Sequence, residues 1–294
     1  MKKILVVGAN GFVGRQVLQT LEKSSYELYA TSHHEDINPD GNHHFVQCDL
    51  SSIEETDKLL NNIQPHIIIN AAALSAVDFC EEHQDMAQRI NVGAVKQMAQ
   101  YCKVTKNRLI HISTDFVFDG KTDQLYNEDD EKNPVNFYGQ TKSDSEDLVM
   151  EMCKSYAIVR VVVVYGTPLP GQHSNIVLLV KNRLEAGEPV RVVNDQYRTP
   201  TYVGDIVKGI VSLLESDQNG IFHLCGKDYM SIADIAFKVA AHFGLDSSLI
   251  EPVSTAQMKE KTPRPQYSGL SIKKAQEVLN YEPLSFDQGL FKIQ

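Results

Sequence analysis

The sequence predicts a doubly wound α/β fold, in which helices cover both faces of a parallel sheet. Two observations favour this fold. Short apolar runs rich in β-branched residues alternate with helical patterns through the first half of the chain, and the runs are apolar throughout. Unbroken apolar strands are typical of a parallel sheet, because both of its faces are buried.

The expected strands of the sheet lie at residues 3–7, 27–31, 43–47, 66–70, 108–113 and 157–165. Between them, apolar side chains recur at the spacing of a helix, as Val13 and Val17 do. A further buried strand is expected at residues 220–226. An amphipathic helix follows it, with Ser231 as its N-cap and Gly244 as its C-cap.

The charge balance argues against several classes of partner. The chain of 294 residues carries 28 lysines and arginines against 38 aspartates and glutamates, a net charge of −10, and no segment is strongly basic. A nucleic-acid partner is therefore not expected. The N-terminal apolar run is interrupted by Gly8, Asn10 and Gly11 and is too short to span a membrane, so no membrane partner is expected either.

The cysteines and histidines give no sign of a disulfide framework or a metal site. The five cysteines are odd in number, widely spaced and without a CxxC pair. They are typical of free thiols in a reducing compartment, so the protein is expected to be cytoplasmic. The histidine pairs at residues 33–34 and 43–44 lack further ligands at a fixed spacing, so no metal is expected.

A glycine-rich turn follows the first expected strand. In the segment VVGANGFVG, three glycines stand between that strand and the first expected helix. Glycines there allow a tight reversal and let the backbone approach a pyrophosphate, which the free N–H groups of the helix can bind. The turn therefore predicts a dinucleotide cofactor. Its expected contacts at the turn are Gly8, Asn10, Gly11, Phe12, Val13 and Gly14.

The end of the second expected strand bears on the choice of cofactor. An acidic residue there would bind the ribose 2′-hydroxyl of NAD, but this chain has Ser32 and His33. Small hydroxyls and imidazoles tolerate a 2′-phosphate, and Arg15 offers a further cation. NADP(H) is therefore favoured, with NAD(H) as the alternative. Asp49 and Leu50, after the third strand, are expected to contact the adenine.

Tyr138 and Lys142 lie one helical turn apart in the segment NFYGQTKSDSEDL. A tyrosine is a poor acid–base group at neutral pH unless a cation stabilises its phenolate, and Lys142 can supply that cation and also bind the nicotinamide ribose. A carbonyl reductase also needs a group that polarises the carbonyl. Ser113 and Thr114, at the carboxyl end of an expected strand, stand where open parallel sheets bind ligands.

These motifs together resemble those of the extended short-chain dehydrogenase/reductases, and most of all the dTDP-4-dehydrorhamnose reductase branch. The resemblance is carried by the glycine turn and by NAAA, INVGAV, STDFVFDG, YGQTK, RTPTYVGD and RPQYSGL, which extend through nearly the whole chain. It implies a Rossmann-type fold in which Thr114 hydrogen-bonds the substrate carbonyl and Tyr138 is the general acid. Lys142 would lower the pKa of Tyr138 and bind the cofactor ribose.

The resemblance also implies contacts to cofactor and substrate. Asn91 would contact the cofactor and support Lys142 through its helix or a water, although it could equally be a polar helix residue, and Asp115 a strand-end cap. The other expected cofactor contacts are Asn70, Ala71, Ala72, Ala73, Tyr138 and Lys142. The candidate substrate contacts are Ser75, Asp115, Phe116, Asn175, Arg198 and Arg264, of which the last three suit a diphosphate because it favours charge-assisted donors.

The sequence therefore predicts an NADPH-dependent reductase of a nucleotide-linked 4-keto-6-deoxysugar, with dTDP-4-dehydrorhamnose as the first candidate substrate. Residues 1–165 would form the NADP(H)-binding domain, completed by late strands near residues 190–225. Residues 166–294 would form mainly an interleaved substrate-binding lobe. A homodimer is a further expectation.

Two features keep other functions open. Val163 stands where the rhamnose-forming reductases commonly have an aromatic residue, and Arg198 stands where they often have a glycine. The sugar or nucleotide recognised can therefore differ. An epimerase or dehydratase of the same superfamily would hold NAD tightly, which Ser32 in place of an acid disfavours. A non-catalytic regulatory subunit, like the related regulatory protein of methionine adenosyltransferase, is the third reading, and the complete set of Thr114, Tyr138 and Lys142 weakens it.

Overall fold

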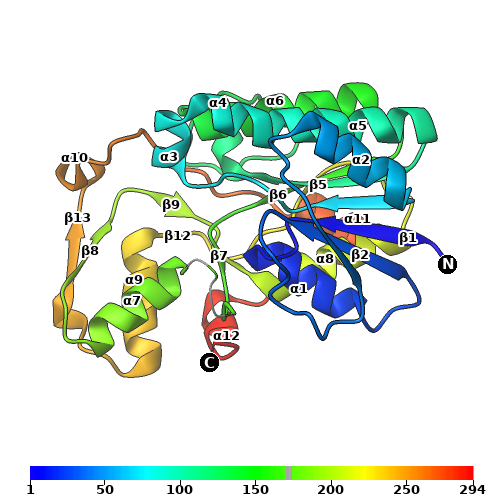
Figure 1. Ribbon diagram of the computed structural model, residues 1–294. Coiled ribbons are helices and arrows are strands. Elements are labelled where there is room, and N and C mark those ends of the chain that lie inside the picture. Colours follow the sequence, from blue (N-terminus) through cyan, green and yellow to red (C-terminus); the bar gives the residue numbers. More distant parts are fainter. Residues whose placement is uncertain (170–171, 173, 294) are drawn as a thin grey trace.

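A seven-stranded parallel sheet forms the larger part of the computed structural model, which describes residues 1–169, 172 and 174–293 (Figure 1). From one edge to the other, its strands are β11 (Gly220–His223), β6 (Tyr156–Val161), β5 (Arg108–Thr114), β4 (Ile67–Asn70), β1 (Lys3–Val7), β2 (Glu27–Ser32) and β3 (His44–Gln47). All neighbouring pairs run parallel. The doubly wound fold predicted from the sequence is confirmed.

Helices cover both faces of this sheet. On one face lie α1 (Phe12–Leu21), α8 (Val203–Glu215) and α11 (Lys273–Leu279), and on the other lie α2 (Ile53–Ile63), α5 (Ala94–Thr105) and α6 (Phe137–Met152). In Figure 1 the second group is above the sheet, with α1 and α8 below it. Successive residues of β1 alternate between the two cores, since Ile4 packs in the first and Leu5 in the second. Among the described residues, no helix has both the length and the apolar composition that crossing a bilayer requires.

The strand order predicts a ligand cleft at the carboxyl ends of the central strands. From β1, the chain proceeds through β2 and β3 on one side and returns through β4, β5 and β6 on the other. Open α/β sheets bind ligands at the carboxyl ends of their strands where the order reverses in this way. The carboxyl ends of β1 and β4, at Val7 and Asn70, mark this reversal.

The chain after β4 and β5 passes through short helices before it reaches the long helices of the covering layer. These are α3 (Val77–Glu82), α4 (Gln84–Ala87), the π-helix η1 (Gln88–Gly93) and the 3₁₀ turn η2 (Asp115–Val117). A π-helix carries one extra residue per turn and often occurs at functional sites. Here η1 contains Asn91, which the sequence predicts at the cofactor.

A smaller lobe with its own core lies beside the sheet, at the left of Figure 1. It contains α7 (Ile176–Glu185), β8 (Val190–Val193), α9 (Ile232–Phe243), η3 (Ser247–Leu249), β13 (Ile250–Val253), α10 (Thr255–Met258) and α12 (Phe286–Leu290). Ser231 caps α9 through a capping box, and Gly244 ends it at φ +66. Both caps agree with the sequence analysis.

One expected strand and one late strand differ in the structure from the expectation. The apolar run 157–165 is not one strand, because β6 ends at Val161 and β7 (Val164–Tyr165) pairs instead with β10 (Thr201–Tyr202). Val163, between them, adopts φ +37. In the late segment 190–225, β11 joins the main sheet while β8 pairs with β13 in the lobe. The division of the chain at residue 165 stays a prediction. The remaining pair, β9 (Tyr197–Arg198) with β12 (Met230–Ser231), is antiparallel.

Candidate active site

The glycine turn between β1 and α1 leaves no room for side chains at Gly8 and Gly14. Gly8 adopts φ +78, and a Cβ atom there would lie 2.7 Å from the backbone of Ala72. A Cβ atom on Gly14 would collide with the carbonyl oxygen of Gly8. Among the described residues, no side chain caps the N-terminus of α1, whose N-cap is Gly11. The N–H groups of the first turn of α1 have no acceptor within the helix, and the glycines before them let a diphosphate approach closely.

A cavity of about 450 Å³ opens beside this turn, at the carboxyl ends of β1 to β4. The predicted cofactor residues among its walls are Gly8, Gly11, Ser32, His33, Asp49, Leu50, Ala71, Ala72 and Ala73. Leu74, Met86 and Ile90 add apolar surface on the side of the short helices. Residues from five separate segments thus line one cavity, with the glycine turn at one wall.

Asn10 and Arg15 are not among the residues that line this cavity. The Nδ2 of Asn10 donates to the carbonyl oxygen of Glu35 at 2.8 Å, so it joins the glycine turn to the loop after β2. Arg15 is 1% exposed, and its Nε and Nη1 atoms have no partner among the described residues. Because the guanidinium is closed off from solvent, this arrangement does not support Arg15 as a cation for a 2′-phosphate. Phe12 and Val13 open α1 directly after the turn.

Thr114 and Tyr138 meet at the carboxyl end of β5. Thr114 is the last residue of the strand, and its hydroxyl oxygen accepts a hydrogen bond from the backbone of Phe116 in η2. Tyr138 lies in the first turn of α6, which Asn136 caps through Gly139 at 2.8 Å. Thr114 acts on the pKa of Tyr138, so the two side chains lie close together. The ring of Phe116 packs edge-on against Tyr138, with 5.9 Å between centroids.

Burial shifts the pKa of Tyr138 and of Lys142 in opposite directions. Burial raises the pKa of Tyr138 well above its ordinary value, with an opposing hydrogen bond from Thr114 and a smaller upward effect of Asp115. Burial lowers the pKa of Lys142 to about 8, against an upward effect of Glu146. Both follow from the cost of placing a charge in a medium of low polarity.

Lys142 directs its amine toward β5. Its Nζ donates to the carbonyl oxygen of Ile112 at 2.7 Å and lies 3.2 Å from Nε2 of His111. The pKa of Tyr138 is shifted by burial and by Thr114, Asp115 and Cys80, and Lys142 is not one of these groups. The role of Lys142 toward Tyr138 and the cofactor ribose therefore stays a prediction.

Asn91 and Asn70 link the cavity wall to the elements behind it. Asn91 accepts from the backbone N–H of Leu74 at 2.8 Å and donates to the hydroxyl of Thr141 at 3.0 Å. Thr141 precedes Lys142 in α6, so support of Lys142 by Asn91 would act through Thr141, and it stays a prediction. Asn70 turns its amide inward to His111. Ser75 follows Leu74 on the exposed side of the same segment.

Arg198 is held inside the protein. It is 2% exposed, and its guanidinium donates to the carbonyl oxygens of Pro265 at 2.7 Å and Tyr197 at 2.8 Å. Its Nε lies 3.5 Å from Asp115, whose carboxylate also accepts from Ser268 at 2.5 Å. The arginine therefore joins the loop after β5 to the lobe. The structure gives it partners other than a substrate diphosphate.

The other two candidates for the diphosphate differ in how easily their side chains can give up their present partners for a ligand. Asn175 caps α7 and donates to the carbonyl oxygen of Gly166 at 2.8 Å, so its amide is engaged on both sides. Arg264 keeps 24% of its side chain exposed, and it forms ion pairs with Glu260 at 2.8 Å and Asp78 at 3.5 Å. Of these candidates, Arg264 can exchange a surface partner for a ligand at the lower cost.

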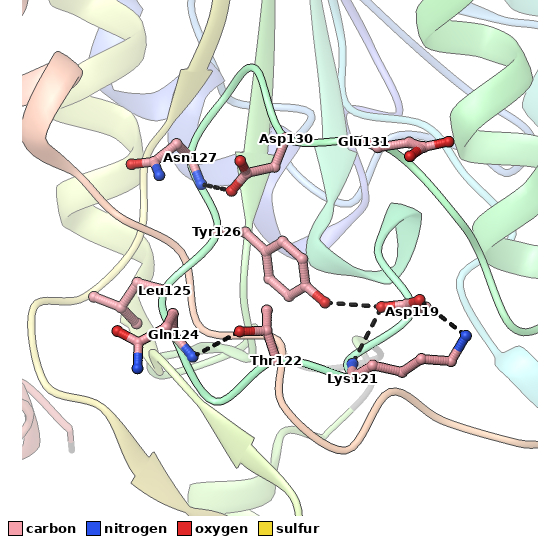
Figure 2. Close-up of a pocket in the computed structure, with 9 residues that line it drawn as sticks. All are labelled: Asp119, Lys121, Thr122, Gln124, Leu125, Tyr126, Asn127, Asp130 and Glu131. Carbon is pink, nitrogen blue, oxygen red and sulfur yellow. Dashed lines mark hydrogen bonds and ion pairs between the residues drawn. The ribbon is translucent and has the colours of Figure 1, made fainter.

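A second hollow, of about 530 Å³, lies along the loop of residues 119–131 (Figure 2). The carboxylate of Asp119 accepts from the hydroxyl of Tyr126 at 2.9 Å and from the backbone of Lys121 at 3.1 Å. Figure 2 shows these bonds closing the loop on itself. Its lining residues include none of the predicted site residues, so we place no function there.

Sequence reasoning missed the buried polar residues behind Lys142. His111 is fully buried on β5, and Glu146 and Arg160 form a buried ion pair with two contacts of 3.0 and 2.8 Å. One signal was available in each case. His111 lies inside a strand expected to be buried on both faces, and Glu146 follows Lys142 by one helical turn on the same face.

Comparisons with known proteins agree with this geometry. A family model described as RmlD substrate binding domain matches residues 1–293. The spore coat polysaccharide biosynthesis protein SpsK of Bacillus subtilis is 32% identical over 94% of this chain and 92% of its own length. Methionine adenosyltransferase 2 subunit beta of Danio rerio is 29% identical over 92% of this chain and 82% of its own length.

Among solved structures, this chain is similar to dTDP-4-dehydrorhamnose reductase of Bacillus anthracis, determined in complex with NADP. The TM-score is 0.87 and the identity 28%, and the match covers 100% of this chain and 99% of the other. The resemblance read from the sequence motifs is therefore confirmed. The chain belongs to the family described as RmlD substrate binding domain, as an extended short-chain dehydrogenase/reductase of the dTDP-4-dehydrorhamnose reductase branch.

Proposed function

We propose that the protein reduces the C4 ketone of a nucleotide-linked 4-keto-6-deoxysugar with NADPH, and that dTDP-4-dehydrorhamnose is its substrate. The observation that carries the proposal is the closeness of Thr114 and Tyr138 at the carboxyl end of β5, the strand next to β4, whose end lines the cavity. Two hydroxyls at one point can bind a carbonyl oxygen and protonate it as it becomes an alkoxide. The solved reductase that binds NADP supports the substrate class.

In this proposal, Tyr138 is the proton donor and Thr114 orients the carbonyl. A donor for reduction must carry its proton at neutral pH, and burial of Tyr138 raises its pKa and so keeps the phenol protonated. Lys142 supports the tyrosine and binds the cofactor ribose. Bound NADPH supplies the hydride.

The glycine turn and the cavity suit that cofactor. The N–H groups at the start of α1 would hold the pyrophosphate, and Gly8 and Gly14 keep the backbone free of Cβ atoms where it approaches. Ser32 and His33 lie where the adenosine ribose would be, and neither repels a 2′-phosphate. NADP(H) is therefore favoured, and NAD(H) is the alternative.

At the other end of the substrate, we propose Arg264 as the contact to the diphosphate, with Ser75 and Phe116 nearer the sugar. Arg264 is partly exposed, and among the described residues its ion-pair partners are the carboxylates of Glu260 and Asp78. Arg198 would act through Asp115, because its guanidinium is already bound to backbone carbonyls. Asn175 would shape the site by fixing the start of α7.

Oxidation of NADPH on addition of substrate tests the proposal. Nucleotide 4-ketosugars with dTDP and with other bases, and the free sugar, are compared by the loss of NADPH absorbance. We expect turnover with the dTDP sugar and none with the free sugar, because the binding energy of the remote nucleotide holds the reacting carbon in place. Turnover only with a sugar linked to another base would show that the nucleotide is wrongly assigned. The nucleotide contacts and Val163 would then be the residues to reconsider.

A non-catalytic regulatory subunit is the second candidate, favoured by the similarity to methionine adenosyltransferase 2 subunit beta. Such a protein would bind NADPH without oxidising it. If a panel of nucleotide ketosugars gives no turnover while calorimetry shows stoichiometric NADPH binding, the regulatory function is favoured over the reductase function.

We also propose that the protein works in the cytoplasm. All five cysteines are buried free thiols, which fits a reducing compartment. A homodimer stays a prediction that sedimentation velocity can test.

A further inference from the structure

A row of buried polar side chains runs behind Lys142, from the cavity wall to α6. The Nδ2 atom of Asn70 on β4 lies 3.1 Å from Nδ1 of His111 on the neighbouring strand β5. The Nε2 atom of His111 lies 3.0 Å from the hydroxyl oxygen of Ser145 and 3.2 Å from Nζ of Lys142. None of these four residues is more than 1% exposed, so bulk water does not compete for their hydrogen bonds.

Neighbouring hydrogen bonds decide which nitrogen of His111 carries the proton. The Oδ1 of Asn70 accepts from the backbone N–H of Ala72 at 3.1 Å, so the NH₂ group of Asn70 is the one that faces His111. It donates to Nδ1, which must therefore be unprotonated. Burial, and then the charge of Lys142, lower the pKa of His111 well below its ordinary value, so the ring is neutral and its proton is on Nε2.

The Nε2–H group of His111 points at two partners. Ser145 donates its own hydroxyl to the carbonyl oxygen of Lys142 at 2.8 Å, so its oxygen is free to accept from His111. The amine of Lys142 can accept from His111 only when it is neutral, because an ammonium has donors and no lone pair. The carbonyl of Ile112, at 2.7 Å, accepts from the amine in either state and fixes its position.

We propose that His111 is a positioning residue for Lys142, which holds the lysine amine against β5 and, through its Nε2–H group, makes that amine release its proton more readily. The proposal deepens the proposed reductase function and depends on it for its catalytic meaning. Tyr138 must regain a proton after each turnover. A lysine that releases its proton near neutral pH is a better source for it than one that holds the proton tightly.

The other groups around Lys142 are consistent with this role. Burial lowers its pKa to about 8, and Glu146, one turn further along α6, raises it. Glu146 is itself bound by Arg160 of β6 in a buried ion pair, which limits its effect on the lysine. The donor of His111 therefore acts in the same direction as burial and against Glu146.

The proton affinity of Lys142 can be measured without any substrate, in the full-length protein labelled with ¹³C at the lysine ε carbons. The Lys142 signal is identified by its absence in Lys142→Arg. In His111→Phe, the titration midpoint of Lys142 should rise by about one pH unit, the size of one lost hydrogen-bond effect. In Ser145→Ala, the midpoint should fall, because the Nε2–H group then donates to the amine alone.

The opposite signs separate this role from mere packing. A loosened core would admit water and raise the midpoint in both variants. A rise in both, or no change in either, would therefore overturn the proposal. So would ¹⁵N spectra of labelled histidine in which the His111 signals, identified in His111→Phe, show the proton on Nδ1. If His111→Phe does not fold, Ser145→Ala and the ¹⁵N spectrum of the unaltered protein still decide. An inactive but correctly titrating protein would count against the reductase function alone.

Discussion

Burial sets the protonation state of each residue at the proposed centre. The phenol of Tyr138 keeps its proton because burial raises its pKa, while burial lowers the pKa of Lys142 to about 8. A half-buried tyrosine that stays neutral and a buried lysine near its midpoint at physiological pH are suited to giving and relaying a proton. The same residues on the surface would be an ordinary polar helix face.

Replacing Tyr138 with phenylalanine tests the proton donor. We expect turnover to fall by about 10²- to 10⁴-fold, the usual contribution of a general acid, while calorimetry finds NADPH binding nearly unchanged. Phe237→Tyr, on the exposed side of α9 in the lobe, is a matched aromatic control that should keep full activity. Retention of most activity in Tyr138→Phe would show that the proton comes from another group.

Replacing Ser32 with aspartate tests the cofactor choice. Ser32 lines the cavity at the end of β2, where a carboxylate would repel a 2′-phosphate and bond a ribose hydroxyl. The ratio of NADPH to NADH affinity, measured by calorimetry, should fall and can reverse. Equal affinities in the unaltered protein would already contradict the assignment of NADPH.

At the scale of elements, one helix and one strand assemble the centre. Helix α6 presents Tyr138, Lys142 and Glu146 at intervals of four residues, so they share one face. That face lies along β5, where Tyr138 meets Thr114 and Lys142 meets the carbonyl of Ile112. The docking of α6 on β5 therefore fixes the relative positions of the proposed catalytic groups.

The ion pair of Glu146 and Arg160 secures this docking. Arg160→Met should lower the free energy of unfolding by about 3 kcal/mol, since removing one partner leaves a buried charge uncompensated. We expect the lower end of the usual range, because Lys132 still lies 3.5 Å from Glu146. Urea unfolding gives the measurement. The double variant with Glu146→Gln should recover part of the loss, and no recovery would mean that packing dominates.

At Val163, the glycine variant should be more stable than the alanine variant, which is the reverse of the usual order of stability. At φ +37 an alanine is strained and a glycine is not, so Val163→Gly should be more stable than Val163→Ala by about 1 kcal/mol. Val161 in β6 has no such backbone angle, and there the alanine variant should be the more stable of the two. The same order at both positions, measured by urea unfolding, would contradict a strained Val163.

At the scale of the whole molecule, the sequence predicted the sheet well because its signals are local. Apolar runs and the glycine turn identify β1 to β5 and the cofactor cleft without any knowledge of long-range contacts. The break between β6 and β7 was not predictable in the same way. Four successive valines contain no turn signal, and the break arises where β7 leaves the sheet to pair with β10.

The parts of the site that escaped prediction depend on contacts across the fold. Asn70 and His111 meet only because β4 and β5 pair in one register. Arg198 was expected to contact the substrate diphosphate, but the carbonyls of residues 265 and 266 converge on it from a segment far along the chain. Side chains that satisfy distant backbone groups leave no periodic pattern in the sequence.

The most direct test of the central claim follows the hydride itself. The protein is incubated with dTDP-4-dehydrorhamnose and with NADPH in which both hydrogens at C4 of the nicotinamide are deuterium, and the sugar product is analysed by mass spectrometry and NMR. The account predicts one deuterium at C4 of the sugar, with transfer suppressed in Tyr138→Phe by about 10²-fold or more. An unlabelled product, or a label at another carbon, would contradict reduction at the proposed centre.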